Sequence, residues 1–111
     1  MFYVGGLYVN QYFKYDKRLK IFLPHLNVNW NQYNLATQNK IVEHWEQIRG
    51  GIPDRIHDLE EQINQKQAEL NQEDDFNKSC QLNEDIADLA SIINDLWIWF
   101  RTTQSITKTH T

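Results

Sequence analysis

The chain has little cysteine, proline and glycine: one Cys, two Pro and four Gly among 111 residues. The single cysteine, Cys80, excludes an intramolecular disulfide and fits a reducing compartment. No run approaches the roughly 20 consecutive apolar residues that a membrane-spanning helix requires. The apolar opening stretch lacks the basic region and the cleavage site of a signal peptide. We therefore expect a cytoplasmic protein that does not associate with membranes.

Catalytic and ligand-binding patterns are also missing from the sequence. The four histidines show no metal-ligand spacing among themselves or with Cys80, and His57 with Glu61 fits a surface pair. Neither Gly5-Gly6 nor Gly50-Gly51 has the context of a phosphate-binding loop. Cys80 is expected to be a small core residue rather than a nucleophile. We expect no enzyme activity, no metal, no cofactor and no small-molecule ligand.

What the sequence does contain is a heptad pattern in two consecutive runs, at residues 53–71 and 76–101. Apolar residues recur at alternating steps of three and four, which is the period of helices that face each other along one seam. The polar residues 72–75 separate the runs and offer Asp74 as an N-cap, and so short a connection requires antiparallel helices. The seam positions are Ile56, Leu59, Ile63, Lys66 and Leu70 in the first run and Ser79, Leu82, Ile86, Leu89, Ile93, Leu96 and Phe100 in the second.

A third helix is predicted before this hairpin, at residues 35–49, because Ile41, Trp45 and Ile48 fall on one face. Asn34 and Thr37 compete as its N-cap. Gly50-Gly51 is expected to end it in a left-handed C-cap, and Pro53 to open the next helix.

The end of the second heptad run is apolar on every face, from Leu96 to Phe100, and this predicts a core at the base of the hairpin. Trp97 should be buried there with Trp45, Ile52 and Ile56. Lys66 is the polar residue in the first stripe. It is expected to bury its stem and to reach a carboxylate at the edge, with a role in pairing register or partner choice as the alternative.

Residues 1–32 are rich in aromatic and β-branched side chains around polar turns, which favours a β-hairpin or two short strands. Residues 27–32 are predicted to form a loop anchored by Trp30. The fold class is therefore mainly α: an antiparallel two-helix hairpin with a coiled-coil-like seam, packed with a third helix and a short extended or β-hairpin segment. We expect one domain over residues 1–101, with residues 33–50 and 52–101 holding the helices, and a disordered tail over 102–111.

Charge is distributed unevenly along the chain. Residues 1–50 hold six Lys/Arg against three Asp/Glu, a net +3, whereas residues 51–95 hold three against twelve, a net −9. An acidic hairpin is a poor surface for nucleic acid. Its carboxylates are most simply a solvated face, although mimicry of DNA toward a basic partner is an alternative.

A local stretch, Asp75-Phe76 followed by Leu82, Ile86 and Leu89, resembles the second helix of the UVR motif, a short helical hairpin that mediates protein contacts. Where that family has Leu-Arg-Asp, this chain has Leu82-Asn83-Glu84, and its first helix is about a turn longer. The likeness covers about fifteen residues, and any heptad hairpin offers as much. We do not assign the chain to that family.

These observations predict a small protein that binds another protein, or a second copy of itself, through the helical hairpin. The expected contact residues are Ile92, Ile98 and Trp99, and a homodimer is one form of this hypothesis. The alternative is an accessory protein that binds single-stranded nucleic acid through stacking and phosphate contacts, although the overall charge opposes it. Its contact residues would be Tyr12, Phe13, Lys14, Lys17, Arg18 and Lys20.

Overall fold

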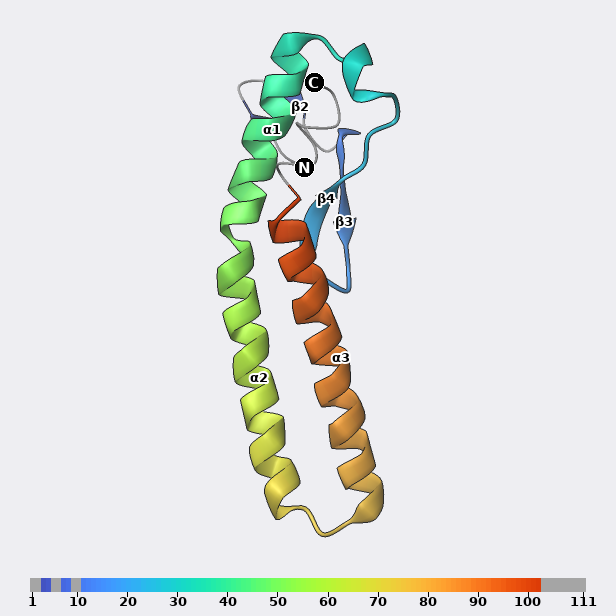
Figure 1. The fold of residues 1–111 in the computed structure, drawn as a ribbon, viewed down its shortest axis with the longest axis vertical. Coiled ribbons are helices and arrows are strands. Elements are labelled where there is room, and N and C mark those ends of the chain that lie inside the picture. Colours follow the sequence, from blue (N-terminus) through green and yellow to red (C-terminus); the bar gives the residue numbers. More distant parts are fainter. Residues whose placement is uncertain (1–2, 5–6, 9–10, 103–111) are drawn as a thin grey trace. The chain divides into compact units, whose positions relative to one another are not determined.

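The computed structural model describes residues 3–4, 7–8 and 11–102, and the chain is mainly helical (Figure 1). The described residues form three α-helices, α1 (Leu35–Gly50), α2 (Ile52–Gln72) and α3 (Phe76–Phe100), with 16, 21 and 25 residues. The helices predicted at residues 35–49, 53–71 and 76–101 agree with these bounds to within one residue. The predicted disordered tail lies outside the described residues, apart from Thr102. Among the described residues, no helix combines the length and the apolarity needed to cross a bilayer.

Contacts divide the chain into two compact units. The first contains residues 1–51 and 99–111, and the second contains residues 52–98. The first unit therefore holds the strands, α1 and the last residues of α3, whereas the second holds α2 and most of α3.

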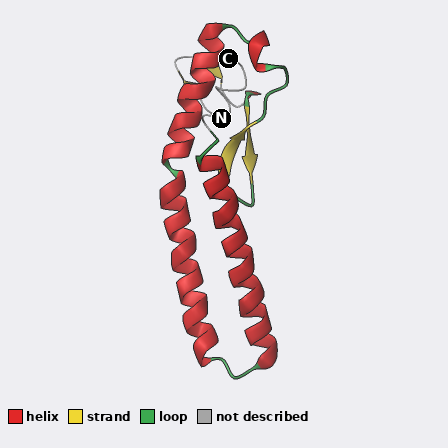
Figure 2. Ribbon diagram, in the orientation of Figure 1, coloured by secondary structure: helices red, strands yellow, loops and turns green. Residues whose placement is uncertain are grey.

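Among the described residues, four short strands form two antiparallel pairs before α1, which confirms the prediction of short strands (Figure 2). Strand β1 (Tyr3–Val4) pairs with β2 (Leu7–Tyr8), and β3 (Phe13–Asp16) pairs with β4 (Ile21–Pro24). The turn between β3 and β4 is held by Asp16, whose Oδ1 accepts a hydrogen bond of 2.8 Å from the backbone N–H of Leu19. Lys20 closes this turn in the left-handed region, with φ of 60°.

The core of the first unit forms where the β3–β4 hairpin meets α1. Phe13 packs edge to face against His44, with ring centroids 4.9 Å apart. Trp30, in the 3₁₀ turn η2 (Trp30–Gln32), is buried, and its carbonyl accepts a hydrogen bond from Gln38 Nε2 at 2.9 Å. Trp30 is thus the predicted anchor. Among the residues of this unit whose burial the structure describes, the buried ones are Phe13, Leu19, Trp30, Ile41, His44 and Trp45.

The ends of α1 agree with the prediction at one side and not at the other. Asn34 is the N-cap, since its Oδ1 accepts a hydrogen bond of 2.8 Å from the N–H of Thr37. The predicted left-handed C-cap is wrong: Gly51 is right-handed, with φ of −87° and ψ of −9°. The reason is that α2 begins at Ile52, directly after Gly51, so the backbone stays near helical values instead of turning away.

In the second unit, α2 and α3 run antiparallel side by side, as predicted (Figures 1 and 2). Residues 73–75 connect them. Asp75, not Asp74, caps α3, because its Oδ1 accepts a hydrogen bond of 3.2 Å from the N–H of Lys78. Glu73 Oε1 in turn accepts one of 3.1 Å from the N–H of Asp75, which draws the cap one residue later than predicted.

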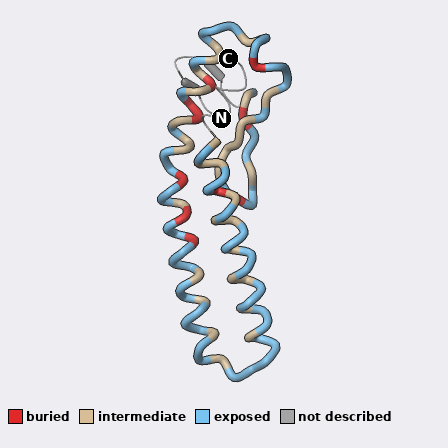
Figure 3. The backbone as a smooth tube through the Cα atoms, in the orientation of Figure 1, coloured by how far each residue is buried: buried red, intermediate tan, exposed pale blue. Residues whose placement is uncertain are grey.

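Burial along the hairpin is strongest at one end (Figure 3). Ile52, Ile56, Leu59 and Leu96 are buried, whereas the seam residues nearer the connection are half-buried. The prediction that Trp97 is buried is wrong, since it is 38% exposed, and the predicted contact residue Ile98 is 50% exposed. Residues next to a seam point away from it by about 100° per position, and a single seam does not cover them.

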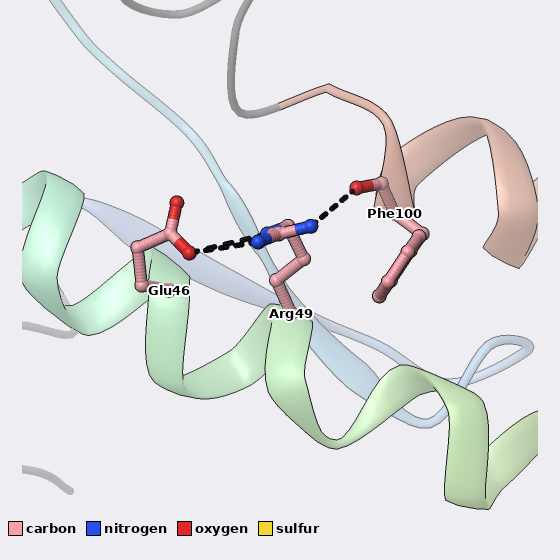
Figure 4. A network of polar contacts seen from close by, with 3 residues as sticks. All are labelled: Glu46, Arg49 and Phe100. Carbon is pink, nitrogen blue, oxygen red and sulfur yellow. Dashed lines mark hydrogen bonds and ion pairs between the residues drawn. The ribbon is translucent and has the colours of Figure 1, made fainter.

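The last two residues of α3, Trp99 and Phe100, contact α1 within the first unit, and Figure 4 shows the contacts of Phe100. Arg49 Nη1 donates a hydrogen bond of 3.2 Å to the carbonyl oxygen of Phe100, and its guanidinium carbon lies 4.9 Å from the centroid of the Phe100 ring. Arg49 also forms an ion pair of 3.0 Å with Glu46 Oε2. Trp45 packs edge to face against Trp99, with centroids 5.9 Å apart.

Candidate interaction surfaces

The seam between α2 and α3 is partly open to solvent. Beyond the buried residues, the seam positions of both helices keep intermediate exposure, because two helices cover each other on one side only. These half-buried apolar residues are Ile63, Leu70, Leu82, Ile86, Leu89 and Ile93. The seam therefore keeps apolar surface on both helices that a third element can cover.

Lys66 is the polar residue within this line, and it crosses from α2 to α3. Its Nζ lies 3.4 Å from Asp85 Oδ2, and about a third of each side chain is exposed (32% and 33%). This confirms the prediction that its ammonium reaches a carboxylate at the edge of the seam. The hydrogen bond from Gln81 Nε2, at 2.9 Å, lowers the pKa of the Asp85 carboxyl, an effect that partial burial opposes and Lys66 reinforces.

A groove of about 490 Å³ lies on the α2–α3 hairpin. We call it the hairpin groove. Ile63 of α2 and Ile93 of α3 give it apolar walls, and the other lining side chains are polar. At its edge, His57 Nε2 lies 3.7 Å from Glu61 Oε1, in a pair that is 71% and 60% exposed. The groove is lined by His57, Glu60, Glu61, Ile63, Asn64 and Ile93.

The His57–Glu61 pair is a surface pair, as predicted. Among the described residues, no group of three or more His, Cys, Asp and Glu is arranged to hold a metal ion. Cys80 is exposed, so its predicted place in the core is wrong. Its neighbour Ser79 occupies the seam position, and this turns Cys80 outward.

The three predicted contact residues differ in exposure. Ile98 is 50% exposed, Ile92 is half-buried, and Trp99 is half-buried with its ring against Trp45. Trp97, which the sequence placed in the core, is 38% exposed and joins Ile98 as exposed apolar surface.

The alternative nucleic-acid residues lie on or directly before the β3–β4 hairpin, and they differ in exposure. Phe13 is buried against His44, so its ring is not available for base stacking. Tyr12 packs edge to face on Tyr33, with ring centroids 5.5 Å apart. Lys14, Lys17, Arg18 and Lys20 are exposed.

A second hollow, of about 230 Å³, lies beside this hairpin; we call it the β-hairpin hollow. Sequence reasoning missed its aromatic side, because Tyr15 and Trp99 are far apart in the chain. Its lining residues are Lys14, Tyr15, Asp16, Leu23, Pro24, His25 and Trp99.

His44 is a titratable group within the core of the first unit, 6% exposed. Burial lowers the pKa of its imidazole, and a hydrogen bond with Gln47 opposes that shift in part. Its position on the buried face of α1, beside Phe13, gives it a structural role.

Comparison with known proteins identifies no relative. The chain matches no protein-family model, no curated protein and no solved structure.

Proposed function

We propose that this chain is a small, non-catalytic interaction protein whose α2–α3 hairpin binds another protein. One observation carries the proposal: the apolar seam residues of a long two-helix hairpin are only half-buried along most of its length. An amphipathic helix laid along such a seam would bury the residues that the two helices leave open. The single cysteine, Cys80, favours a reducing compartment, and we propose the cytoplasm.

Site-specific photo-crosslinking tests the hairpin as the binding element. A photoreactive amino acid is placed at one exposed position of each hairpin helix, Gln67 and Ala90, and at the exposed Asn39 of α1 as a control. We expect defined protein adducts from positions 67 and 90 and none from position 39. Adducts from position 39 alone, or from no position, would contradict the proposal.

Self-association is one form of this function, with Ile92, Ile98 and Trp99 as contacts. Ile98, at 50% exposed, is the best exposed of these three residues, and symmetric dimers are the commonest assembly. Sedimentation of the wild type at micromolar concentration tests it, with Ile98→Glu as the disrupting variant. A wild type that sediments as a monomer would rule out the dimer while leaving a heterologous partner in place.

A second candidate function is the binding of single-stranded nucleic acid at the β-hairpin hollow. The observation that favours it is the joint presence of Lys14, His25, Tyr15 and Trp99 around one hollow. Stacking on an aromatic ring and phosphate contacts would then combine. The net charge of −4 opposes it.

The test is the binding of an oligodeoxynucleotide at ~50 and ~200 mM salt, where phosphate-driven affinity falls steeply. The double variant Lys14→Gln/Lys17→Gln should weaken binding, and Lys78→Gln on the other unit should not. Absence of binding at the lower salt concentration would end this candidate.

A further inference from the structure

We propose that the hairpin groove binds an amphipathic helix with lysine or arginine flanking its apolar stripe, supplied by another protein. This inference rests on the proposed interaction function and names the class of partner and its seat. Three features support it: the apolar walls, the length of the groove and its charge.

The apolar walls come from facing helices. Ile63 of α2 and Ile93 of α3 are both half-buried, so each keeps apolar surface that solvent reaches. An apolar side chain inserted between them would bury this remaining surface on both sides. Such insertion of side chains into a helical groove is a common mode of peptide recognition.

The length of the groove fits two such side chains. Its α2 residues run from His57 to Asn64, about two helical turns, which corresponds to ~10 Å along the axis. Apolar residues three or four positions apart on a partner helix lie about 5–6 Å from each other. Two consecutive apolar residues of a partner stripe therefore fit within the groove, whose volume is about 490 Å³.

The charge of the groove selects a basic partner. Glu60 and Glu61 are exposed at its edge, and residues 51–95 carry twelve acidic against three basic side chains. One of those cations, Lys66, is already paired with Asp85. Like charges at i,i+4 next to the groove, as in Asp54/Asp58, weaken the isolated helix. Cations on a partner would relieve this repulsion and steer the encounter.

The same charge disfavours the other occupants. A second copy would bring another hairpin of net −9 to the groove, and like-charge juxtaposition opposes binding. A nucleic acid would meet the same repulsion.

The experiment uses the full chain and a synthetic helical peptide of about 18 residues, or five turns. The peptide carries leucines with i,i+3/i+4 spacing and lysines on both flanks. Two control peptides have the same leucines with glutamate in place of lysine, or the same composition in scrambled order. We expect the lysine peptide to bind with a Kd on the order of 10 µM, as suits a small interface. Its affinity should fall between ~50 and ~300 mM salt, and neither control peptide should bind.

Variants locate the binding to the groove. Glu60→Gln/Glu61→Gln should weaken the lysine peptide about fivefold, and Asn64→Trp, which fills the groove from an exposed position, should abolish binding. The matched control Asp74→Asn/Glu84→Gln removes the same charge at exposed positions outside the groove and should leave the affinity within about twofold. Circular dichroism and urea melts establish that each variant folds as the wild type does.

Equal weakening by the two double variants would mean diffuse attraction to an acidic surface and would overturn the proposal. So would failure of the lysine peptide to bind, or binding of the glutamate peptide with the same affinity. If the peptide fails while crosslinks from positions 67 and 90 persist, the hairpin binds proteins but not through a basic helix. If the crosslinks fail as well, the interaction function itself is wrong.

Discussion

Arg49 contacts Phe100 in two ways at once: its guanidinium lies 4.9 Å from the ring centroid, and its Nη1 donates a hydrogen bond of 3.2 Å to the carbonyl oxygen. The carbonyl belongs to the last turn of α3, where helical oxygens have no intrahelical donor. A side chain 51 positions earlier in the chain thus completes the end of this helix.

Replacing Arg49 with lysine should show the value of this contact. Lysine keeps the charge but lacks the planar fork, so we expect Arg49→Lys to destabilise the protein by about 1 kcal/mol. Urea denaturation measures the change. Glu46→Gln is the control, since this partly exposed ion pair should contribute less than about 0.5 kcal/mol. A larger loss from Glu46→Gln than from Arg49→Lys would contradict the assignment.

Substitution of Leu96 should destabilise the protein more than substitution of its larger neighbour Trp97. Leu96 is fully buried, so Leu96→Ala should lower the free energy of unfolding by about 2–5 kcal/mol. Trp97 is 38% exposed, so Trp97→Ala should lower it by about 1 kcal/mol or less. Glu73→Ala at the connection should change the unfolding midpoint very little. Urea melts of the three variants give the order, and a Trp97 variant as unstable as the Leu96 variant would count against the observed burial.

This contrast marks what the sequence can and cannot predict. The heptad steps identify Leu96 as a seam residue, because spacing alone determines which residues share a helical face. They do not reveal that Trp97 is exposed, since the cover over the other faces comes from segments far away in sequence. The same reason applies to the hairpin groove, which depends on the gap between Ile63 and Ile93 on different helices.

The N-caps of α1 and α3 were predictable to within one residue. Asn34 is the predicted cap, but Asp75 replaces Asp74, because the choice depends on how Glu73 bonds the connection. Lys66 and its acidic partner followed from the seam, since a long basic side chain at such a position must reach the edge.

Protonation of His44 should destabilise the fold. Burial lowers the pKa of its imidazole in the folded chain, so the unfolded chain takes up a proton first as the pH falls below about 6.5. Stability from this group is complete above that pH and is lost as the pH falls toward the folded-state pKa.

We therefore expect the wild-type urea midpoint to fall between pH 7.5 and pH 5.5, in the range about the ordinary histidine pKa. It should fall less in His44→Phe, which keeps a ring beside Phe13 and cannot be protonated. His44→Gln is a second uncharged variant and should flatten the profile in the same way. Parallel pH profiles for all three proteins would show that His44 does not contribute.

Lys66→Leu should stabilise the hairpin by about 1 kcal/mol. The variant gains apolar burial in the seam and loses an ion pair that is about a third exposed. Lys66→Ala, which loses the pair without the gain, is the control in urea melts. A change in sedimentation of the leucine variant would instead support a role for Lys66 in partner choice, as polar seam residues have in coiled coils.

The decrease in burial from Leu59 to Leu70 along α2 has a consequence for motion within the hairpin. Local opening costs least where few apolar contacts must be broken. The amide hydrogens beside the connection at residues 73–75 should therefore exchange with solvent first, and those near Leu59 and Leu96 last. We therefore expect the two helices to separate first beside their connection and last near Leu59 and Leu96.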